Sequence, residues 1–156
     1  MIEIAIPGGN RLHLANALLD FNGTLALDGR LIEGVAKRLR TLASLMELHV
    51  VTGDTTGTAA RELAGLPVHL HVMPPEGQDL AKRSALAALA QAQTVAVGNG
   101  RNDLGVIERA RLSIVVVGRE GCAAQTLMQA DIVCSSIADA LDLLLAPQRI
   151  VATLRR

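Results

Sequence analysis

The chain has 156 residues, about the size of one domain, and half of them are apolar, which excludes an intrinsically disordered protein. Its 15 basic and 15 acidic residues cancel, and Phe21 is the sole Phe, Tyr or Trp, so neither charge nor stacking side chains indicate a nucleic-acid partner. No apolar run approaches the ~20 residues of a membrane span and no signal peptide is apparent, so we expect a cytoplasmic protein without a membrane partner.

Short apolar runs along the chain are predicted as strands. Residues 2–6 and 12–19 flank the turn Pro7-Gly8-Gly9-Asn10 and are predicted to pair as an N-terminal hairpin. Five further runs have the length and composition of buried strands: 48–51, 68–72, 95–97, 114–117 and 132–134.

Helical periodicity fills the segments between these runs. The first helix is expected to bury one face made of Val35, Leu39, Leu42 and Leu45. Asp54 or Thr55 is expected to cap a second helix that runs towards Leu63, and Asp79 to start a third with Leu86 and Leu89 inward. Three more helices are predicted to begin near Asn102, Arg119 and Ile137.

This alternation predicts an α/β fold with a doubly wound, Rossmann-like parallel sheet and helices on both faces. No linker or repeat interrupts residues 1–156, so we expect a single domain. Only 32 positions separate Asp20 from Thr52 and 30 separate Thr52 from Lys82, which leaves no room for an inserted cap domain. Apolar residues alternate around Asp28-Gly29, which predicts a small β-hairpin flap over residues 25–32.

Polar residues follow three of the predicted strands, at the sheet edge where ligands bind in open α/β folds. They are Asp20, the segment Thr52-Gly53-Asp54 and the segment 98–103, and Lys82 lies in the helix before the last of them. A carboxylate such as Asp20 can attack phosphorus, and Asp103 can help it to bind Mg²⁺. Thr52 and Lys82 can hold phosphoryl oxygens and stabilise charge in the transition state.

Each of these features alone has an ordinary structural explanation. Asp20 can end a strand in a turn, Thr52 can belong to a helix cap, and Lys82 can lie at the surface. Lys82 is one of only two lysines against 13 arginines, however, and the four features occur in order at strand or helix ends. The combination therefore favours a phosphoryl-binding site.

Other polar residues are expected to be structural. His69 and His71 have the i, i+2 spacing of a ligand pair on a strand face, but the sequence offers no third ligand. His13 lies in the strand that approaches the site, and Cys122 and Cys134 lack the spacing of a redox or zinc motif. Arg30 and Arg101 can either contact substrate or lie at the surface.

The motifs resemble those of the haloacid-dehalogenase (HAD) superfamily of phosphotransferases. Leu18-Leu19-Asp20-Phe21-Asn22-Gly23-Thr24 is similar to its first motif, Thr52 to the hydroxyl of the second, Lys82 to the lysine of the third, and 98–103 to the acidic fourth. Within the superfamily the chain most resembles the phosphorylation domain of P-type ATPases. Thr52-Gly53-Asp54 is similar to their hinge motif, and Gly98-Asn99-Gly100-Arg101-Asn102-Asp103 to their Gly-Asp-Gly-x-Asn-Asp motif. Because the membrane helices and other pump domains are absent, the chain is similar to the soluble, capless members.

The resemblance implies a function and a set of site residues. It implies a Mg²⁺-dependent phosphohydrolase that forms an aspartyl-phosphate, acting on a phosphorylated small molecule or a phosphoprotein. The catalytic residues would be Asp20, Asn22 and Lys82; the substrate-binding residues Thr52, Gly53, Lys82 and Asn102; and the metal ligands Asp20, the backbone carbonyl of Asn22, Asn99 and Asp103. A site without a cap is open, which also suits a homo-oligomer in which a neighbour closes the pocket.

Two residues depart from the family pattern. Phosphatases of the family have a proton-transferring Asp where this chain has Asn22, and relatives have a Mg²⁺-binding Asp where it has Asn99. General acid–base help is worth about 10²–10⁴-fold, so we expect slow turnover. Two alternatives remain: a module that binds or accepts a phosphoryl group for regulation without useful turnover, and a structural partner of a transport system.

Overall fold

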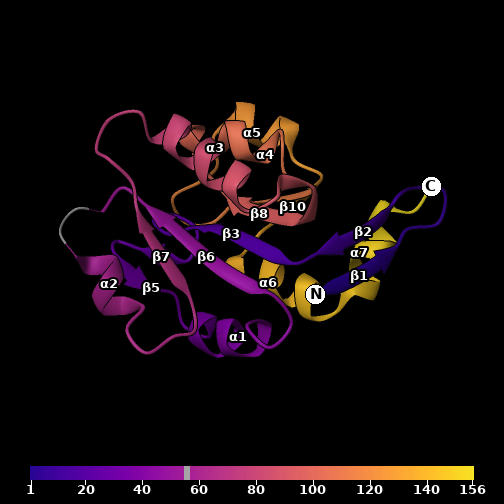
Figure 1. The fold of residues 1–156 in the computed structure, drawn as a ribbon, viewed down its shortest axis with the longest axis horizontal. Helices are drawn as coiled ribbons and strands as arrows, with labels where there is room; N and C mark the ends of the chain where they lie inside the picture. Colours follow the sequence, from indigo (N-terminus) through magenta and orange to yellow (C-terminus); the bar gives the residue numbers. More distant parts are fainter. Residues whose placement is uncertain (55–56) are drawn as a thin grey trace.

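The computed structural model describes residues 1–54 and 57–156 and has a parallel sheet at its centre (Figure 1). In the described part of the chain this sheet has six strands in the order β10-β9-β8-β3-β6-β7. The bounds are β3 (Asn16–Asp20), β6 (Glu47–Thr52), β7 (His69–Val72), β8 (Thr94–Gly98), β9 (Leu112–Val116) and β10 (Ile132–Cys134). The predicted α/β class is confirmed.

The strand order places the ends of three strands side by side. From β3 the chain adds β6 and β7 on one side, and then returns to add β8, β9 and β10 on the other. The direction in which the chain adds strands therefore reverses between β3 and β8, which is the position at which open α/β sheets bind ligands. Asp20 ends β3, Thr52 ends β6 and Gly98 ends β8, so the polar residues that follow these strands meet at this edge.

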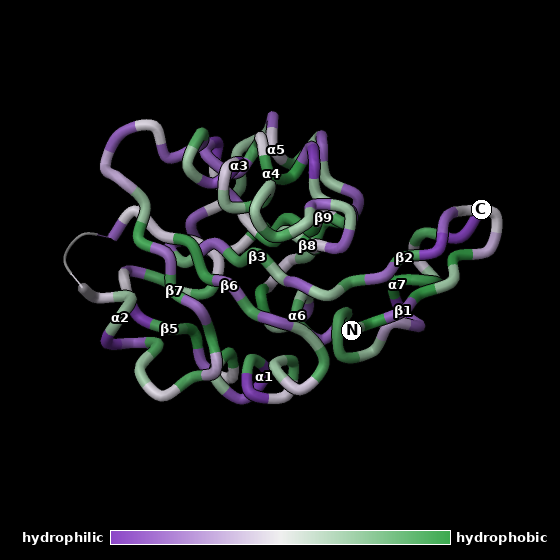
Figure 2. Tube along the Cα trace, in the orientation of Figure 1, coloured by the Kyte–Doolittle hydropathy of each residue, from purple (hydrophilic) through white to green (hydrophobic). Residues whose placement is uncertain are grey.

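Helices cover both faces of the sheet (Figure 1). The helices α1 (Val35–Leu42), α2 (Thr58–Glu62) and α6 (Ile137–Leu145) pack on one face, and α3 (Gln78–Ala88), α4 (Leu104–Ile107) and α5 (Ala124–Gln129) on the other. Two short 3₁₀ helices, η1 (Gln91–Gln93) and η2 (Arg101–Asp103), flank β8. Strands β8 and β9 are buried along their whole length, as in the interior of a parallel sheet, and hydrophobic residues dominate them (Figure 2).

A separate two-stranded sheet extends from one end of the molecule. It consists of β1 (Ile2–Ala5) and β2 (Arg11–Leu14), and α7 (Pro147–Leu154) packs against it (Figure 1). The predicted N-terminal hairpin is confirmed, but the expected second strand is divided at Ala15. The backbone of Ala15 leaves the hairpin, because its N–H donates to the Gln93 carbonyl and its own carbonyl accepts from the Glu47 N–H.

The predicted flap after Asp20 is present. Its strands β4 (Ala26–Leu27) and β5 (Arg30–Leu31) are joined by Asp28 and Gly29, which both have positive φ, of 52° and 76°. Two such residues form the turn that matches the twist of a hairpin, and Asp tolerates this conformation better than most residues. The Leu31 N–H donates to Oε2 of Glu62 in α2 at 2.8 Å, so the flap is attached to its own domain.

Several predicted helix boundaries are corrected by the structure. Helix α1 ends at Leu42, and Leu45 is 38% exposed in the turn that follows. No helix begins at Arg119 in the described chain, because a tight turn from Gly118 to Gly121 occupies this position and α5 starts only at Ala124. Backbone hydrogen bonds set the turns at both boundaries, and apolar spacing along the sequence does not reveal them.

Two helix starts agree more closely with the sequence. Asp54 does not occupy the cap position of α2, which is Gly57, but its Oδ2 accepts the Ala59 N–H at 2.7 Å and so serves the first turn. Thr55, the alternative cap, lies outside the described residues. Helix α3 begins one residue before the predicted Asp79. Among the described residues, no helix combines the length and apolar character needed to cross a bilayer.

Packing of α6 against the sheet gives a stability prediction. Leu141 is fully buried in the main core, whereas Leu80 on α3 is 59% exposed. We expect Leu141→Ala to lower the free energy of unfolding by about 2–5 kcal/mol, because it leaves a cavity that neighbours fill only in part. The matched helix substitution Leu80→Ala should change it by less than about 0.5 kcal/mol. Urea unfolding followed by circular dichroism measures both, and equal effects would contradict the assigned core.

Candidate active site

A buried lysine joins two carboxylates at the ends of the central strands. Lys82 of α3 is fully buried, and its Nζ donates to Oδ1 of Asp20 and to Oδ1 of Asp103, at 2.6 Å each. Asp20 and Asp103 are themselves 7% and 1% exposed. Three residues from β3, α3 and η2 therefore form one charged group with a net charge of about −1 when both carboxylates are ionised.

Burial sets the protonation of this group. It raises the pKa of Asp20 from 3.8 to about 7, and the negative charge of Asp103 adds to this, while Lys82 and the Thr24 hydroxyl oppose it. Burial alone would lower the pKa of Lys82, but the charges of Asp20 and Asp103 outweigh it and raise that pKa. Lys82 is therefore held as the cation, and Asp20 exchanges its proton near neutral pH.

Asp103 lies behind the lysine rather than at an open surface. Its Oδ1 accepts from Lys82, and its Oδ2 accepts the backbone N–H groups of Asn99 and Gly100 at 3.1 and 2.9 Å. A Cβ at Gly98 would lie 2.6 Å from the Asp103 carboxyl group, so glycine is needed there for this close approach. Both oxygens thus accept hydrogen bonds within the protein, and the role of Asp103 as a metal ligand stays a prediction.

A polar cleft of about 530 Å³ opens directly above Asp20. Six of the predicted site residues line it: Asp20, Asn22, Thr52, Gly53, Asn99 and Asn102. The sequence did not mark three further lining residues, Gly29, Gln78 and Glu120, as part of a site. The structure therefore brings the predicted residues together, with Lys82 and Asp103 beneath the cleft.

One side of the cleft gathers groups that can bind phosphoryl oxygens. The Thr52 hydroxyl accepts the Asp54 N–H at 3.1 Å, and the Asn22 side-chain amide lies 3.5 Å from the same hydroxyl. Asn102 donates to Oε1 of Gln78 at 3.1 Å, and the Gln78 side chain lies directly over Gly53. Gln78 was missed because it comes from the first turn of α3, where the sequence offers only a polar helix start.

The other side of the cleft contains oxygen atoms that can bind a metal ion. The Thr24 hydroxyl lies 3.1 Å from Oδ2 of Asp20 and 3.3 Å from Oδ1 of Asn99, so it holds these two oxygens close to each other. The Asn99 amide nitrogen donates to the Gly121 carbonyl at 3.1 Å, which holds the amide oxygen towards Asp20. A carboxylate and an amide oxygen are the kinds of ligand that Mg²⁺ prefers, so this side fits a hard divalent cation.

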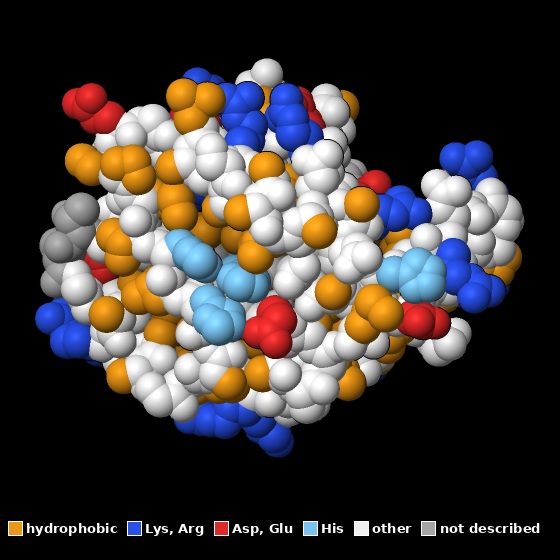
Figure 3. Space-filling model, in the orientation of Figure 1, with side chains coloured by type: hydrophobic (Ala, Val, Ile, Leu, Met, Phe, Trp, Pro, Cys, Tyr) orange, Lys and Arg blue, Asp and Glu red, His pale blue; other side chains and the backbone are white. Residues whose placement is uncertain are grey.

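The histidines lie away from this cleft. His49, His69 and His71 form a patch on β6 and β7 beside Glu47 (Figure 3). His49 and His71 share a hydrogen bond of 3.1 Å, and His69 lies 3.0 Å from Glu47. Within residues 1–54 and 57–156, no group of three or more His, Cys, Asp or Glu side chains is arranged to hold a metal ion.

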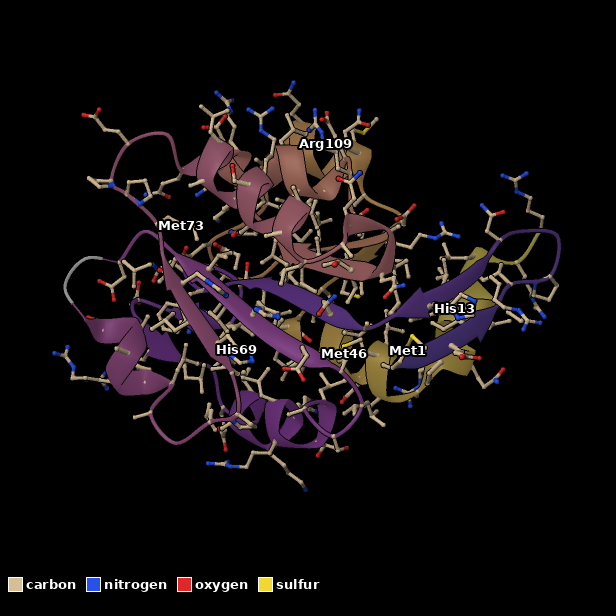
Figure 4. All side chains as sticks on the ribbon, viewed as in Figure 1. Met1, His13, Met46, His69, Met73 and Arg109 are labelled. Atoms are coloured by element: carbon tan, nitrogen blue, oxygen red, sulfur yellow. The ribbon has the colours of Figure 1, made fainter. Side chains whose placement is uncertain are left out.

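The remaining candidates also lie outside the cleft. His13 on β2 lies 3.6 Å from Glu3 on the N-terminal hairpin, far from His69 and Met73 (Figure 4). Cys122 and Cys134 are both free thiols. Arg30 and Arg101 do not line the cleft above Asp20.

Loss of the buried lysine gives a second prediction. We expect Lys82→Met to lower the free energy of unfolding by about 3–5 kcal/mol near pH 8, because two buried carboxylates lose their counter-charge. Without Lys82, the two buried carboxyl groups bind protons more readily in the native state than in the unfolded state. A fall in pH therefore stabilises the native state of the variant, and its loss of unfolding free energy should shrink towards pH 5. Lys37→Met, at the other lysine and exposed on α1, is the control and should have little effect. A pH-independent loss measured by urea unfolding would contradict the charge argument.

No family model matches the chain. Two uncharacterized proteins of Methanocaldococcus jannaschii match parts of it. MJ0073 is 48% identical over 61 residues, which cover 39% of this chain and 66% of MJ0073, so the chain spans just under two thirds of that protein. MJ0072 is 46% identical over 39 residues, which cover 25% of this chain and 89% of MJ0072.

Solved structures match almost the whole chain. A Legionella pneumophila protein assigned to subfamily III A of the HAD superfamily hydrolases aligns with a TM-score of 0.72 at 16% identity, over 90% of this chain and 86% of that one. The cobalt-bound deoxy-D-mannose-octulosonate 8-phosphate phosphatase of Haemophilus influenzae gives 0.72 at 15%, over 92% and 94%. The 3-deoxy-D-manno-octulosonate 8-phosphate phosphatase of Moraxella catarrhalis, in complex with magnesium, phosphate and KDO, gives 0.67 at 21%, over 92% and 94%. The chain therefore has the fold of the HAD superfamily hydrolases, as the motif resemblance predicts, and belongs to one family with MJ0072.

Proposed function

We propose that this protein is a Mg²⁺-dependent phosphohydrolase that acts through an aspartyl-phosphate on Asp20. The observation that carries the proposal is the buried Lys82 between Asp20 and Asp103, directly beneath a polar cleft at the switch point of the sheet. Such a carboxylate faces substrate while a fixed cation stabilises it, which is the arrangement that nucleophilic attack on a phosphoryl group requires. Three solved phosphatases and hydrolases with this fold support the same reaction class.

The residues give a two-step reaction. A carboxylate oxygen of Asp20 forms a bond to phosphorus while the bond from phosphorus to the leaving oxygen breaks, and that oxygen takes a proton from solvent. Water then attacks the phosphorus, the bond to Asp20 breaks, and inorganic phosphate leaves with the carboxylate restored. Lys82 stabilises the charge on Asp20 throughout, and Thr52 with the amide groups of Gly53 and Asn102 would hold the phosphoryl oxygens.

A divalent cation would lie on the opposite side of Asp20. Asp20 and Asn99 would hold it together with the backbone carbonyl of Asn22, and Asp103 would contribute its charge from behind Lys82. When bound, Mg²⁺ supplies positive charge that offsets the negative phosphoryl oxygens. Solved structures of this fold hold magnesium in one case and cobalt in another, which supports a divalent cofactor.

Asn22 limits the expected rate. Its amide lies in the cleft beside the Thr52 hydroxyl, where a carboxyl group would be needed to give and take protons. An amide cannot transfer the proton, so protonation of the leaving group depends on water. This observation also favours the second candidate, a module that holds a phosphoryl group without useful turnover.

A phosphorylated small molecule is the substrate class that we propose. The Moraxella catarrhalis phosphatase with this fold was solved with phosphate and KDO, so sugar-acid phosphates belong among the first compounds to test. We further propose that residues 1–156 act as a single domain without a cap in the cytoplasm, and that the likeness to P-type ATPases reflects the shared phosphorylation chemistry.

Phosphate release from a panel of phosphorylated metabolites tests the function. We expect slow release that needs Mg²⁺, stops with EDTA and is absent from Asp20→Asn, which keeps the shape of the nucleophile without its charge. Asn22→Asp should raise the rate by about tenfold or more, because it restores a proton donor. If no compound loses phosphate above the Asp20→Asn control, but the protein forms a beryllofluoride adduct, the binding module replaces the enzyme.

The pKa of Asp20 predicts how cation activation depends on pH. Its pKa of about 7 means that the proton and Mg²⁺ compete for the same carboxylate. As the pH falls below about 7, the Mg²⁺ concentration for half-maximal rate should rise by up to about tenfold per pH unit, and added Mg²⁺ should restore the rate. Mg²⁺ titrations of the phosphatase rate between about pH 5.5 and 8.5 measure this dependence. A half-maximal concentration that stays constant across this range would contradict the raised pKa.

A further inference from the structure

Asn99 is neutral at a place where a cation is expected to bind. Beneath it, Lys82 offsets one of the two charges of Asp20 and Asp103, so the buried group offers about one net negative charge to a divalent ion. Cation affinity depends strongly on the number of charged ligands. A carboxylate on the same side of the cleft as Asn99 would add to the negative charge that the ion meets.

Glu120 lies in a turn that is built onto Asn99. Gly118 and Gly121 pair across this turn, with the Gly121 N–H donating to the Gly118 carbonyl at 2.9 Å, and Gly121 has a φ of +76°. Asn99 holds the turn at two points. Its side-chain amide donates to the Gly121 carbonyl at 3.1 Å, and its backbone carbonyl accepts the Ala123 N–H at 2.8 Å. The position of Glu120 is thus coupled to that of Asn99.

The Glu120 carboxylate lies close to Gly23. A Cβ built on Gly23 would lie 2.5 Å from Oε2 of Glu120 and 2.6 Å from the amide nitrogen of Asn99. The carboxylate and the amide are therefore no more than about 5 Å apart. Gly23 also has a φ of +79°, a backbone conformation that favours glycine. A side chain at this position would collide with both Glu120 and Asn99, so glycine allows the two to approach each other.

Glu120 is available to a ligand in the cleft. It lines the same cavity as Asp20 and Asn99. In the part of the chain that the structure describes, no ion pair offsets its charge, although Arg119 is its neighbour in sequence. Its carboxylate lies near Asn99, which follows β8 on one side of Asp20, whereas Thr52 ends β6 on the other side.

We propose that Glu120 supplies the negative charge that Asn99 lacks, and that it sets the affinity of the cleft for Mg²⁺. The inference rests on the proposed function, since it concerns the same cation site. Mg²⁺ keeps several of its waters when it binds proteins, so Glu120 acts on the ion through this hydration shell and need not touch it. Across a few ångströms the charge of a carboxylate acts strongly on a divalent ion.

Calorimetric titration of the metal-free protein with Mg²⁺ tests the proposal without any substrate. We expect Glu120→Gln, which keeps the shape of the side chain, to weaken Mg²⁺ binding by about tenfold, equivalent to about 1.4 kcal/mol. The matched control is Glu3→Gln, which removes the same charge from β1 on the N-terminal hairpin, and its affinity should equal that of the unmodified protein. Circular dichroism and urea unfolding show that each variant is folded.

A second variant makes the charge argument specific. Asn99→Asp should tighten Mg²⁺ binding, and in that background Glu120→Gln should cost less than it does in the original chain, because the charge has already been restored. Unchanged affinity in Glu120→Gln overturns the proposal, even if the pH profile of catalysis changes, since that result would assign Glu120 to proton transfer. Equal loss in Glu3→Gln, or no Mg²⁺ binding by the unmodified protein, also overturns it.

The outcomes separate this proposal from the proposed function. Mg²⁺ binding that weakens in Glu120→Gln, without phosphate release from any compound, supports the role of Glu120 and contradicts the enzyme. Phosphate release that depends on Asp20, with Mg²⁺ affinity unaffected by Glu120→Gln, supports the enzyme and contradicts the role of Glu120.

Discussion

The contact of one buried ammonium with two carboxylates determines how the rest of the site is arranged. Lys82 holds Asp20 and Asp103 at 2.6 Å each, and so fixes β3, α3 and η2 relative to one another. A buried charge is tolerated only where its partners are close and satisfied, and Asp103 meets this condition by accepting two backbone N–H groups. One cation cannot neutralise two anions, however, so the group retains a net negative charge that faces the cleft through Asp20.

Strand order explains why this charge lies where a ligand can reach it. Asp20, Thr52 and Asn99 are far apart in sequence, but β6 and β8 are the two neighbours of β3, so their carboxyl ends meet. The parallel register aligns Asp20 with Val51 and Leu19 with Val97, so that Thr52 and Gly98 emerge on either side of Asp20. In the proposed function, one side would thus offer hydroxyl and amide groups to a phosphoryl group, and the other would offer oxygen ligands to a cation.

The sequence predicted the parts of this site that local pattern encodes. Apolar runs located the central strands. Asp20 and Thr52 stood out as polar residues at strand ends, and Lys82 stood out as one of only two lysines. The engaged oxygens of Asp103, the division of a strand at Ala15 and the approach of Glu120 to Gly23 all depend on contacts between distant segments. Spacing along the chain carries no information about such contacts, so only the folded structure reveals them.

Asn22 and Asn99 have different consequences, because the first affects turnover and the second affects cation binding. Asn22 lies beside the Thr52 hydroxyl, and its amide cannot transfer the proton that a carboxyl group would. Asn99 lies on the cation side, where Glu120 approaches within about 5 Å and can restore the missing charge. A site that keeps its cation charge but lacks its proton shuttle stabilises the phosphorylated state more than it accelerates hydrolysis. Under the proposed function, this geometry therefore favours a long-lived aspartyl-phosphate over rapid release of phosphate.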